Sequence, residues 1–416
     1  MGGRCEPPRA SAGPLPVLFL VADTGGGHRA AARAISAELA RAYPGRFAPV
    51  FCDPLGGPGS SPLLRRVSGL YGPVVRLTPW LWGAAWHLTD SRPVMRLLRA
   101  LLARANRPVA DAVARHRPAA IVSLHPLTGP AAAAARVTLT PAAPVITVVT
   151  DLVTPHTAWA AGAGHPVVVP TVAARRRLLG TAGSGAEGGS GRVVVAGLPV
   201  GAGFVCGPAS PGERAALRRS LGLPRRRFTV VLTGGGEGCG GLTRRAKALL
   251  RRFDDVQVVA LCGRNRRLRR RLDRLAERCG GRLTVRGFTA DMASWLRCAD
   301  VVAGKAGPGT IAEAACCGAA LLLTSHLPGQ EHGNTGYVTS AGAGAHVPGA
   351  RHLAAEVARL RADPAALDAM RAAATRLARP TAATVIAARV AGLAGAGPVR
   401  DQAGERGAAR PLAGVL

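Results

Sequence analysis

The chain has 416 residues, 48% of them hydrophobic, and its mean hydropathy of +0.17 allows two domains of ordinary size with a sizeable core. Its 54 lysine and arginine residues outnumber 23 acidic ones, and the net charge of +31 favours an anionic partner: nucleic acid, an anionic lipid surface or a phosphorylated substrate. Nine cysteines, an odd number without a C-x-x-C pair, argue against a zinc site or a disulfide framework and for a reducing compartment.

The first expected elements are a strand and a helix joined by a glycine turn. Val17–Ala22 is an apolar run of strand length, too short to span a membrane. Residues 29–39 carry apolar side chains at helical spacing, so Gly25, Gly26 and Gly27 fill the turn between the two elements. The stretch Leu15–Ala22, which follows Arg4 and Arg9, could pass as a signal-peptide core, but it leads directly into this turn and helix, which predicts a core strand.

This glycine turn suits either a phosphate or a close approach of a ligand to the backbone. Glycines leave room beside the chain, and a helix N-terminus offers unpaired N–H groups and a positive dipole end. The spacing Gly25-x-Gly27-x-x-Ala30, with Asp53 after the next apolar run, also fits a loose dinucleotide fingerprint. A nicotinamide-dependent oxidoreductase is therefore one candidate, and a tight turn that binds nothing is another.

Further along the chain, strands and helices alternate in two series. Apolar strand-like runs recur at 48–53, 119–124, 144–151, 165–170 and 192–197, and then at 228–233, 256–263, 282–288, 300–307 and 319–325. This pattern predicts an α/β fold with two doubly wound, Rossmann-like domains that face each other across a cleft. We expect the boundaries as follows: a flexible N-terminus at 1–13, domains at 14–200 and 201–379, a C-terminal helix at 380–394 that crosses back, and a flexible tail at 395–416.

A tryptophan- and arginine-rich stretch follows the second strand. Trp80, Trp82 and Trp86 lie between leucines and arginines in residues 63–107, where Asp90 is the one acidic residue. This composition is typical of a segment that binds a membrane interface, although an ordinary helix pair with a solvated basic face would have it too.

Two motifs at successive strand ends carry the strongest chemical signal. In "GKAGPGTIAEAACCG" (304–318), the turn Gly307-Pro-Gly309-Thr310 presents N–H groups suited to a diphosphate, and Glu313 lies one turn further, within reach of a ribose. "PGQEHGN" (328–334) then starts a helix with polar side chains that suit sugar hydroxyls, namely Gln330, Glu331 and Asn334.

With these motifs the sequence resembles the monogalactosyldiacylglycerol synthases and processive diacylglycerol glucosyltransferases of glycosyltransferase family 28. The resemblance runs from about residue 17 to about residue 393. It rests on "DTGGGHRA" (23–30), "VVTDLVTPHTAW" (148–159), "GGGEGCG" (234–240), "GFTADM" (287–292), "KAGPGTIAEA" (305–314) and "PGQEHGN". It implies a GT-B fold, UDP-galactose or UDP-glucose as donor, and diacylglycerol or a similar lipid acceptor at a membrane surface.

The donor side is expected in the second domain. The chain has no D-x-D pair of the kind that holds a divalent metal on a nucleotide sugar, so we expect no metal and no cofactor. Backbone N–H groups and helix dipoles would then stabilise the diphosphate, supplied by the loop of Gly235, Gly236 and Glu237 and by residues 307–310. The resemblance adds a uracil contact by the backbone near Phe288.

The acceptor side and the catalytic base are expected in the first domain. His28 has a suitable unperturbed pKa for a general base, and Asp151, at the end of its strand, is either a rival base or the group that orients His28. The resemblance places His156 and Trp159 near the acceptor. Gly26, Gly27 and Trp82 complete the expected acceptor side.

One departure from the family and two alternative functions remain. "GLPV" (197–200) continues into Gly201, where relatives often carry a polar or basic residue, so a donor contact is in doubt. A nicotinamide-dependent oxidoreductase would leave the second half unexplained. A nucleic-acid-binding protein would rest on a net charge that a GC-rich genome also explains, without a recognised motif, so we expect no nucleic acid partner. We expect a cytoplasmic enzyme bound peripherally to the inner face of the plasma membrane.

Overall fold

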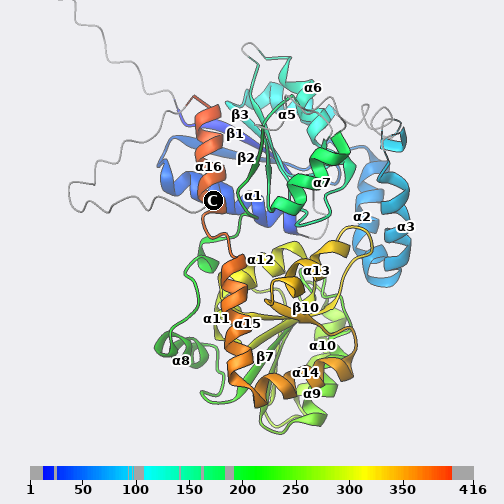
Figure 1. Cartoon of the computed structure of the whole chain (residues 1–416). Coiled ribbons are helices and arrows are strands. Elements are labelled where there is room, and N and C mark those ends of the chain that lie inside the picture. The colour runs from blue at the N-terminus through cyan, green and yellow to red at the C-terminus, as the bar shows by residue number, and fades with distance from the viewer. Residues whose placement is uncertain are drawn as a thin grey trace, which may run out of the picture.

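The computed structural model describes residues 13–22, 26–91, 93–95, 97, 107–139, 142–160, 164–182 and 192–395. They form two α/β units, each built on a parallel six-stranded sheet (Figure 1). This confirms the predicted fold class of two doubly wound sheets. The predicted flexible ends, 1–13 and 395–416, lie outside the described residues apart from Gly13 and Gly395.

The first sheet has the strand order β2-β1-β3-β4-β5-β6. Its second strand, β1, is buried from Val17 onward and pairs with β2 and β3, as Leu18 does with Val50 and Ile121. The expected core strand is thereby confirmed. The strands of this sheet are β1 (Leu15–Leu20), β2 (Phe47–Cys52), β3 (Ala120–Ser123), β4 (Val145–Val148), β5 (Val167–Val169) and β6 (Val193–Val195).

The helices of the first unit cover this sheet and extend beyond it. α1 packs on one face beneath the C-terminal helix, whereas α5 and α6 lie on the other (Figure 1). These elements are α1 (Gly27–Ala42), α2 (Pro62–Leu77), α3 (Pro79–Thr89), α5 (Arg107–His116), α6 (Gly129–Arg136), the 3₁₀ turn η2 (Thr157–Ala160) and α7 (Val172–Ala182). None of the described helices is both long and apolar enough to cross a bilayer.

The second sheet has the order β12-β11-β10-β7-β8-β9. It comprises β7 (Phe228–Thr233), β8 (Val256–Leu261), β9 (Leu283–Arg286), β10 (Val301–Lys305), β11 (Ala320–Ser325) and β12 (Gly344–His346). The 3₁₀ turn η4 (Ala202–Phe204) precedes its helices. These are α8 (Pro211–Ser220), α9 (Leu242–Arg252), α10 (Arg266–Ala276), α11 (Met292–Cys298), α12 (Pro308–Cys316), α13 (His332–Ser340), α14 (Ala350–Ala362) and α15 (Pro364–Leu377).

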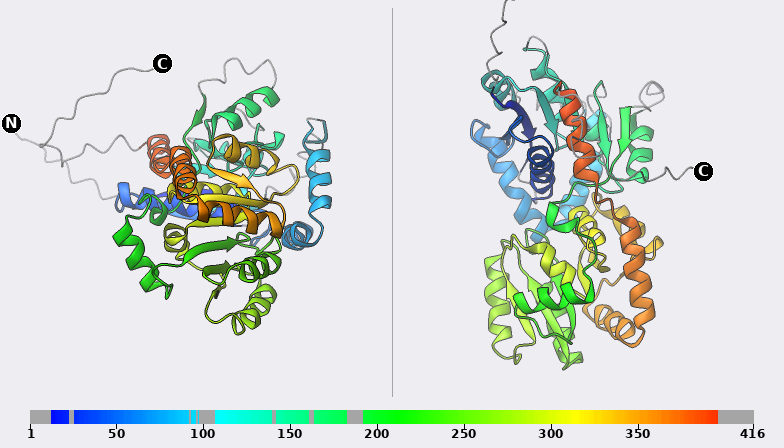
Figure 2. Two further views of the ribbon diagram at one scale, coloured as in Figure 1. Left: turned by 60° about the horizontal axis from the view of Figure 1, so that its bottom comes forward. Right: turned by 90° about the vertical axis from the view of Figure 1, so that its left-hand side faces the viewer.

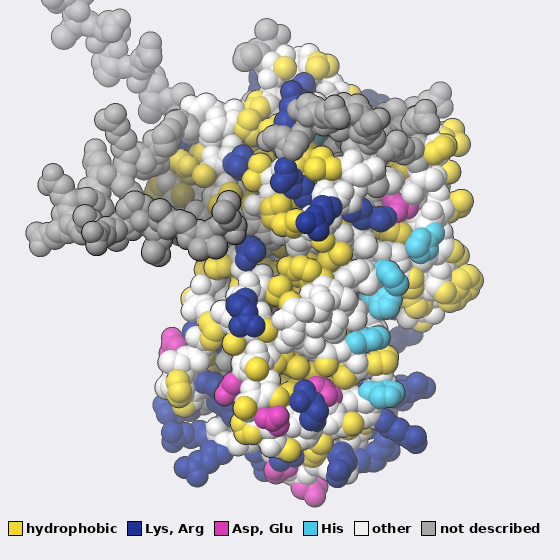
Figure 3. All heavy atoms as spheres, viewed as in Figure 1, with side chains coloured by type: hydrophobic (Ala, Val, Ile, Leu, Met, Phe, Trp, Pro, Cys, Tyr) yellow, Lys and Arg dark blue, Asp and Glu magenta, His cyan; other side chains and the backbone are white. Residues whose placement is uncertain are grey.

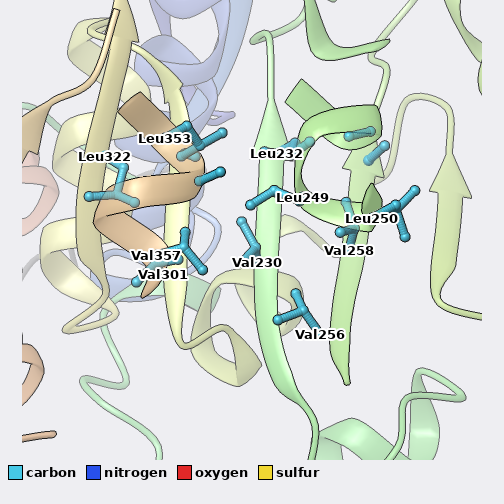
Figure 4. Close-up of a cluster of buried hydrophobic side chains, with 14 of the residues drawn as sticks. Val230, Leu232, Leu249, Leu250, Val256, Val258, Val301, Leu322, Leu353 and Val357 are labelled. Atoms are coloured by element: carbon cyan, nitrogen blue, oxygen red, sulfur yellow. The ribbon is translucent and has the colours of Figure 1, made fainter. Parts of the chain in front are cut away.

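Aliphatic side chains fill the core of this second unit on both faces of the sheet. On one face, Val230 and Val258 of the strands meet Leu249 of α9, and Val301 and its neighbours meet α14 (Figure 4). Near-continuous apolar strands of this kind are what a parallel sheet covered on both faces requires. The carboxyl ends of β7 and β10, where the glycine-rich loops begin, thus have a rigid support.

The last helix, α16 (Ala382–Leu393), returns to the first unit. Its buried side chains Ile386, Ala387 and Val390 belong to the same core cluster as Val17 and Ile35. Figure 2 shows it beside the first sheet, beyond the end of α15. The chain therefore crosses between the two units twice.

Candidate active site

The turn before α1 places the first predicted catalytic residue. Gly26 is the N-cap of α1 with a φ of +84°, a left-handed conformation that glycine adopts without strain, and Gly27 opens the helix. Gly25 lies outside the described residues. His28 follows in the first turn of the helix, only 7% exposed, and its Nδ1 lies 2.8 Å from the Thr150 hydroxyl.

Burial determines the protonation state of His28. Its ring lies edge-on to His125, with ring centroids 5.0 Å apart, and 6.2 Å from the ring of Trp159. Removal from water penalises the charged imidazolium and lowers the pKa of His28 to about 4, although a hydrogen bond to the Leu124 backbone acts the other way. The imidazole is therefore neutral near pH 7, which is the form that accepts a proton.

Asp151 lies just beyond β4 and accepts hydrogen bonds from residues of both domains. Trp159 donates its indole N–H to Oδ2 at 2.6 Å, and the Gln330 amide donates to Oδ1 at 3.0 Å. Burial raises the pKa of Asp151 to about 6, and the hydrogen bonds from Gln330 and Trp159 oppose this shift. The hydrogen bonds found for the His28 side chain among the described residues go to the Thr150 hydroxyl and to the Leu124 backbone, not to Asp151. Thr150 and Leu124 therefore orient the imidazole.

His156 and the α3 tryptophans form the wall beside this carboxylate. The His156 ring accepts the Ala158 N–H at Nδ1, and its Nε2 lies 3.1 Å from the Thr89 hydroxyl. Trp86 packs edge-on against this ring, with centroids 4.6 Å apart. Both ring nitrogens are thus engaged within the protein, and an acceptor role for His156 stays a prediction.

Trp82 is half-buried and offers a donor group. Its ring contacts Tyr71 edge-on at 5.0 Å and lies 6.2 Å from Trp86. Within the described residues its buried indole N–H has no hydrogen-bond partner. An N–H in this state is suited to a ligand oxygen.

The loop after β7 was predicted to hold the diphosphate. The Gly235 N–H already donates to the Thr233 hydroxyl at 3.2 Å, and the Gly236 carbonyl accepts from the Arg264 N–H at 2.8 Å. Glu237 forms ion pairs at 3.7 Å with Arg76 of α2 and with Arg264. Part of this loop therefore already forms hydrogen bonds and ion pairs within the protein.

The second predicted diphosphate element is the N-terminus of α12. Gly307 is its N-cap and donates its own N–H to the Lys305 carbonyl, while Gly309 and Thr310 form the first turn. Glu313 lies half-buried in the next turn, and burial raises its pKa to about 7. Among the described residues its carboxylate has no hydrogen-bond or ion-pair partner, so it is available to a ligand hydroxyl.

The three polar residues of 328–334 have different surroundings. Glu331 is buried, pairs with Lys305 and accepts the Leu327 N–H at 2.8 Å. Asn334 is also buried and donates to the Ala306 carbonyl at 2.9 Å, so both residues fix the loops around α12. Gln330 instead reaches across to Asp151, and Thr154 donates to its backbone carbonyl at 2.8 Å.

Phe288 lies at the rim of the second unit, 63% exposed, with the Arg264 guanidinium 5.3 Å from its ring centre. The uracil contact near this residue stays a prediction. Sequence reasoning overlooked Thr150, Tyr71, Arg76 and Arg264, which the structure places at this site. Thr150 could have been found, since it directly precedes Asp151. Tyr71 and Arg76 belong to the stretch 63–107, which suited either a membrane interface or an ordinary helix pair, and Arg264 opens an arginine-rich run at 264–274.

Within the described part of the chain, no group of three or more His, Cys, Asp or Glu side chains is placed to hold a metal ion. The arrangement that does exist brings the His28 imidazole and the Asp151 carboxylate of the first unit together with polar loops of the second. Two facing Rossmann-like sheets with such loops at their carboxyl ends are the architecture of the GT-B fold, which is found in many glycosyltransferases.

The comparisons with known proteins agree with this class. The glycosyltransferase family 28 C-terminal domain matches residues 229–386. A probable monogalactosyldiacylglycerol synthase 2 of Oryza sativa is 36% identical over 363 residues, which cover 84% of this chain and 74% of the rice protein. Monogalactosyldiacylglycerol synthase 1 of Arabidopsis thaliana is 32% identical, with 89% and 69% of the two chains covered.

Two solved structures share the fold at low identity. MurG of Acinetobacter baumannii has a TM-score of 0.57 at 16% identity, covering 91% of this chain and 99% of its own. Anabaena HepE, in complex with UDP and glucose, has a TM-score of 0.54 at 16% identity, covering 91% and 100%. The chain belongs to the monogalactosyldiacylglycerol synthase family, within glycosyltransferase family 28. It is a glycosyltransferase. This family membership favours glycosyl transfer over the oxidoreductase and nucleic-acid-binding alternatives.

Proposed function

We propose that this enzyme transfers a hexose, galactose or glucose, from a UDP-sugar to diacylglycerol or a similar lipid at a membrane surface. The observation that carries the proposal is the hydrogen bond between Asp151 and Gln330. It brings the predicted sugar-binding loop of one domain to Asp151, the rival base, of the other. The choice of diacylglycerol as acceptor rests on the activity named for the plant relatives.

The chemistry is a single displacement with inversion. The acceptor hydroxyl gives its proton to the neutral imidazole of His28 as its oxygen bonds to the anomeric carbon. The bond from that carbon to the diphosphate breaks, and its electron pair leaves with UDP. Thr150 orients the imidazole, while Asp151 is the rival base.

Donor binding is assigned to the second domain without a metal ion. The first turn of α12 supplies N–H groups and a positive dipole end to the diphosphate, and Glu313 accepts from the ribose. Gln330 and Asn334 serve the hexose, since each has a buried side-chain oxygen that lacks a partner among the described residues.

The outer side of α2 and α3 is assigned to the membrane. Large apolar side chains are exposed along both helices, namely Leu63, Val67, Leu70, Leu77, Trp80, Leu81 and Leu88. Figure 3 shows hydrophobic side chains on the flank where these helices lie. An apolar surface next to exposed arginines suits anionic lipid headgroups. Attachment to the inner face of the plasma membrane stays a prediction from sequence.

Thermal unfolding with candidate ligands in EDTA tests the donor class. UDP at about 100 times its Kd is expected to stabilise the protein by about 2.7 kcal/mol, whereas NAD(P) and an oligonucleotide leave the melting temperature unchanged. Stabilisation by NAD(P) or the oligonucleotide alone contradicts the proposal. Binding of UDP that disappears on chelation contradicts its metal-free part.

A further inference from the structure

Three charged side chains from separate elements meet beside the glycine loop. Arg76 comes from the last turn of α2, Glu237 from the loop after β7, and Arg264 from the loop after β8. Both guanidinium groups lie 3.7 Å from the Glu237 carboxylate, one on each oxygen. We call these three residues the arginine clamp.

The clamp lies between the two domains. A Cβ at Gly26, the N-cap of α1, would lie 3.9 Å from Arg264 Nη1, so this arginine reaches the turn before His28. A Cβ at Gly72 of α2 would lie 3.1 Å from Glu237 Oε2. The clamp therefore adjoins the predicted base on one side and the glycine loop on the other.

The guanidinium groups retain free hydrogen-bonding capacity. Within the described residues, the Arg264 side chain forms only the long ion pair and its contact with the Phe288 ring. Arg76 donates its Nε–H to the Gly72 carbonyl at 3.1 Å, which leaves its terminal N–H groups for other partners. Guanidinium forks of this kind match phosphate oxygens.

We propose that Arg76 and Arg264 bind the diphosphate of the sugar nucleotide from opposite domains. The proposal rests on the proposed UDP-sugar donor and extends it to two residues outside the predicted site. Two positive groups and one carboxylate leave one excess positive charge, which attracts an anion. As the sugar–phosphate bond breaks, negative charge builds on the leaving diphosphate, and the two arginines stabilise it.

Glu237 has a different role from the donor contact predicted for it. Its carboxylate holds the two guanidinium groups together and gives way when the diphosphate oxygens replace it. Without the Glu237 carboxylate between them, the two positively charged guanidinium groups would repel each other. Glu237 is thus a positioning residue.

Calorimetric titration of UDP, with uridine titrated in parallel by ligand-observed NMR, tests the clamp. Arg76→Ala and Arg264→Ala should each lower UDP affinity about tenfold to a hundredfold, as the loss of charge-assisted hydrogen bonds implies. Uridine affinity should stay unchanged because uridine has no phosphate. Arg66→Ala on α2 and Arg267→Ala on α10, both at exposed arginines, are matched controls with unchanged UDP affinity.

Three results separate the possible failures. If the wild-type protein binds no UDP, the proposed function itself falls. If it binds UDP and both clamp variants bind it equally well, the clamp alone is wrong. If the alanine variants lose uridine affinity as much as UDP affinity, the effect is structural and the clamp is overturned. Arg264→Lys should keep part of the UDP affinity because it keeps the positive charge. Glu237→Gln should retain or increase UDP affinity, and a loss as large as in Arg264→Ala would contradict its positioning role.

Discussion

Burial acts on His28 and Asp151 in opposite directions because it penalises the charged form of each group. It lowers the pKa of His28 to about 4 and raises that of Asp151 to about 6. Both groups are therefore in the proton-accepting form at pH 7. Their different pKa values allow a kinetic experiment to tell which one is the base.

The pH dependence of kcat/KM should reveal the base. A base must be deprotonated to act, so activity is lost as the pH falls through its pKa. With His28 as the base, the acid limb of the profile should lie near pH 4 in wild-type enzyme. An acid limb near pH 6 that disappears in Asp151→Asn, with residual activity, would transfer the role to Asp151.

Substitution of His28 supplies an independent measurement. His28→Ala should lower turnover by ~10²–10⁴-fold while UDP affinity stays nearly constant, because the base acts in the transition state. Steady-state kinetics and calorimetry measure the two quantities separately. A large drop in UDP affinity would instead make His28 a phosphate-binding residue.

Glu313 is predicted to bind the ribose hydroxyls. Its partly buried carboxylate has no partner among the described residues, so Glu313→Ala should weaken UDP binding by about 1–3 kcal/mol. Calorimetry with UDP and with 2′,3′-dideoxy-UDP provides the test. Equal effects of the substitution on both nucleotides would show that the carboxylate does not read the ribose.

At the residue scale, the sequence indicated the chemical groups but not all of their partners. His28, Asp151 and Gln330 were found because each lies in the loop after a strand or in the first turn of the helix that follows it, and parallel strand ends meet at one edge of a sheet. Arg76 and Arg264 escaped detection because they belong to arginine-rich segments. Only the fold distinguishes an arginine that lies between the two domains from its solvated neighbours.

At the element scale, α2 and α3 have two distinct faces. Trp86 is buried and packs against Gly329, whose φ is +78° and where a Cβ would overlap the indole. Trp80, in contrast, is 69% exposed. The sequence left open whether the three tryptophans face a membrane interface or belong to an ordinary helix pair. Because α3 is apolar around most of its circumference, its pattern did not indicate which side docks on the second domain.

Membrane binding is therefore expected to depend on the outer face alone. Leu77→Ala with Trp80→Ala should reduce pelleting with anionic liposomes and leave UDP affinity unchanged. Val172→Ala on α7, another exposed apolar position, serves as the control. Unchanged pelleting of the double variant would place the lipid surface elsewhere.

At the scale of the whole molecule, α16 holds the C-terminal end of the described chain in the core of the first domain. Ile386 is fully buried there, whereas Val385 of the same helix is 36% exposed. Ile386→Ala should lower the free energy of unfolding by about 2–5 kcal/mol, and Val385→Ala should change it by less than about 0.5 kcal/mol. Urea denaturation measures both, and equal effects would contradict the assigned packing.

The alternation of strands and helices was enough to predict both sheets, because buried parallel strands form long apolar runs. The edge strand β12 was missed since Gly344–His346 is short and lacks branched side chains. Contacts between the domains, such as the Asp151–Gln330 hydrogen bond, depend on how two folded units meet. No local pattern encodes them.

The function proposed for this enzyme is hexose transfer from a UDP-sugar to a lipid between the two domains. Incubation of the wild-type protein with radiolabelled UDP-galactose or UDP-glucose, diacylglycerol vesicles and EDTA tests it most directly. Label is expected in a hexosyl-diacylglycerol of inverted anomeric configuration, and almost none is expected with His28→Ala. A folded wild-type protein that binds UDP yet transfers no label to the lipid would contradict it.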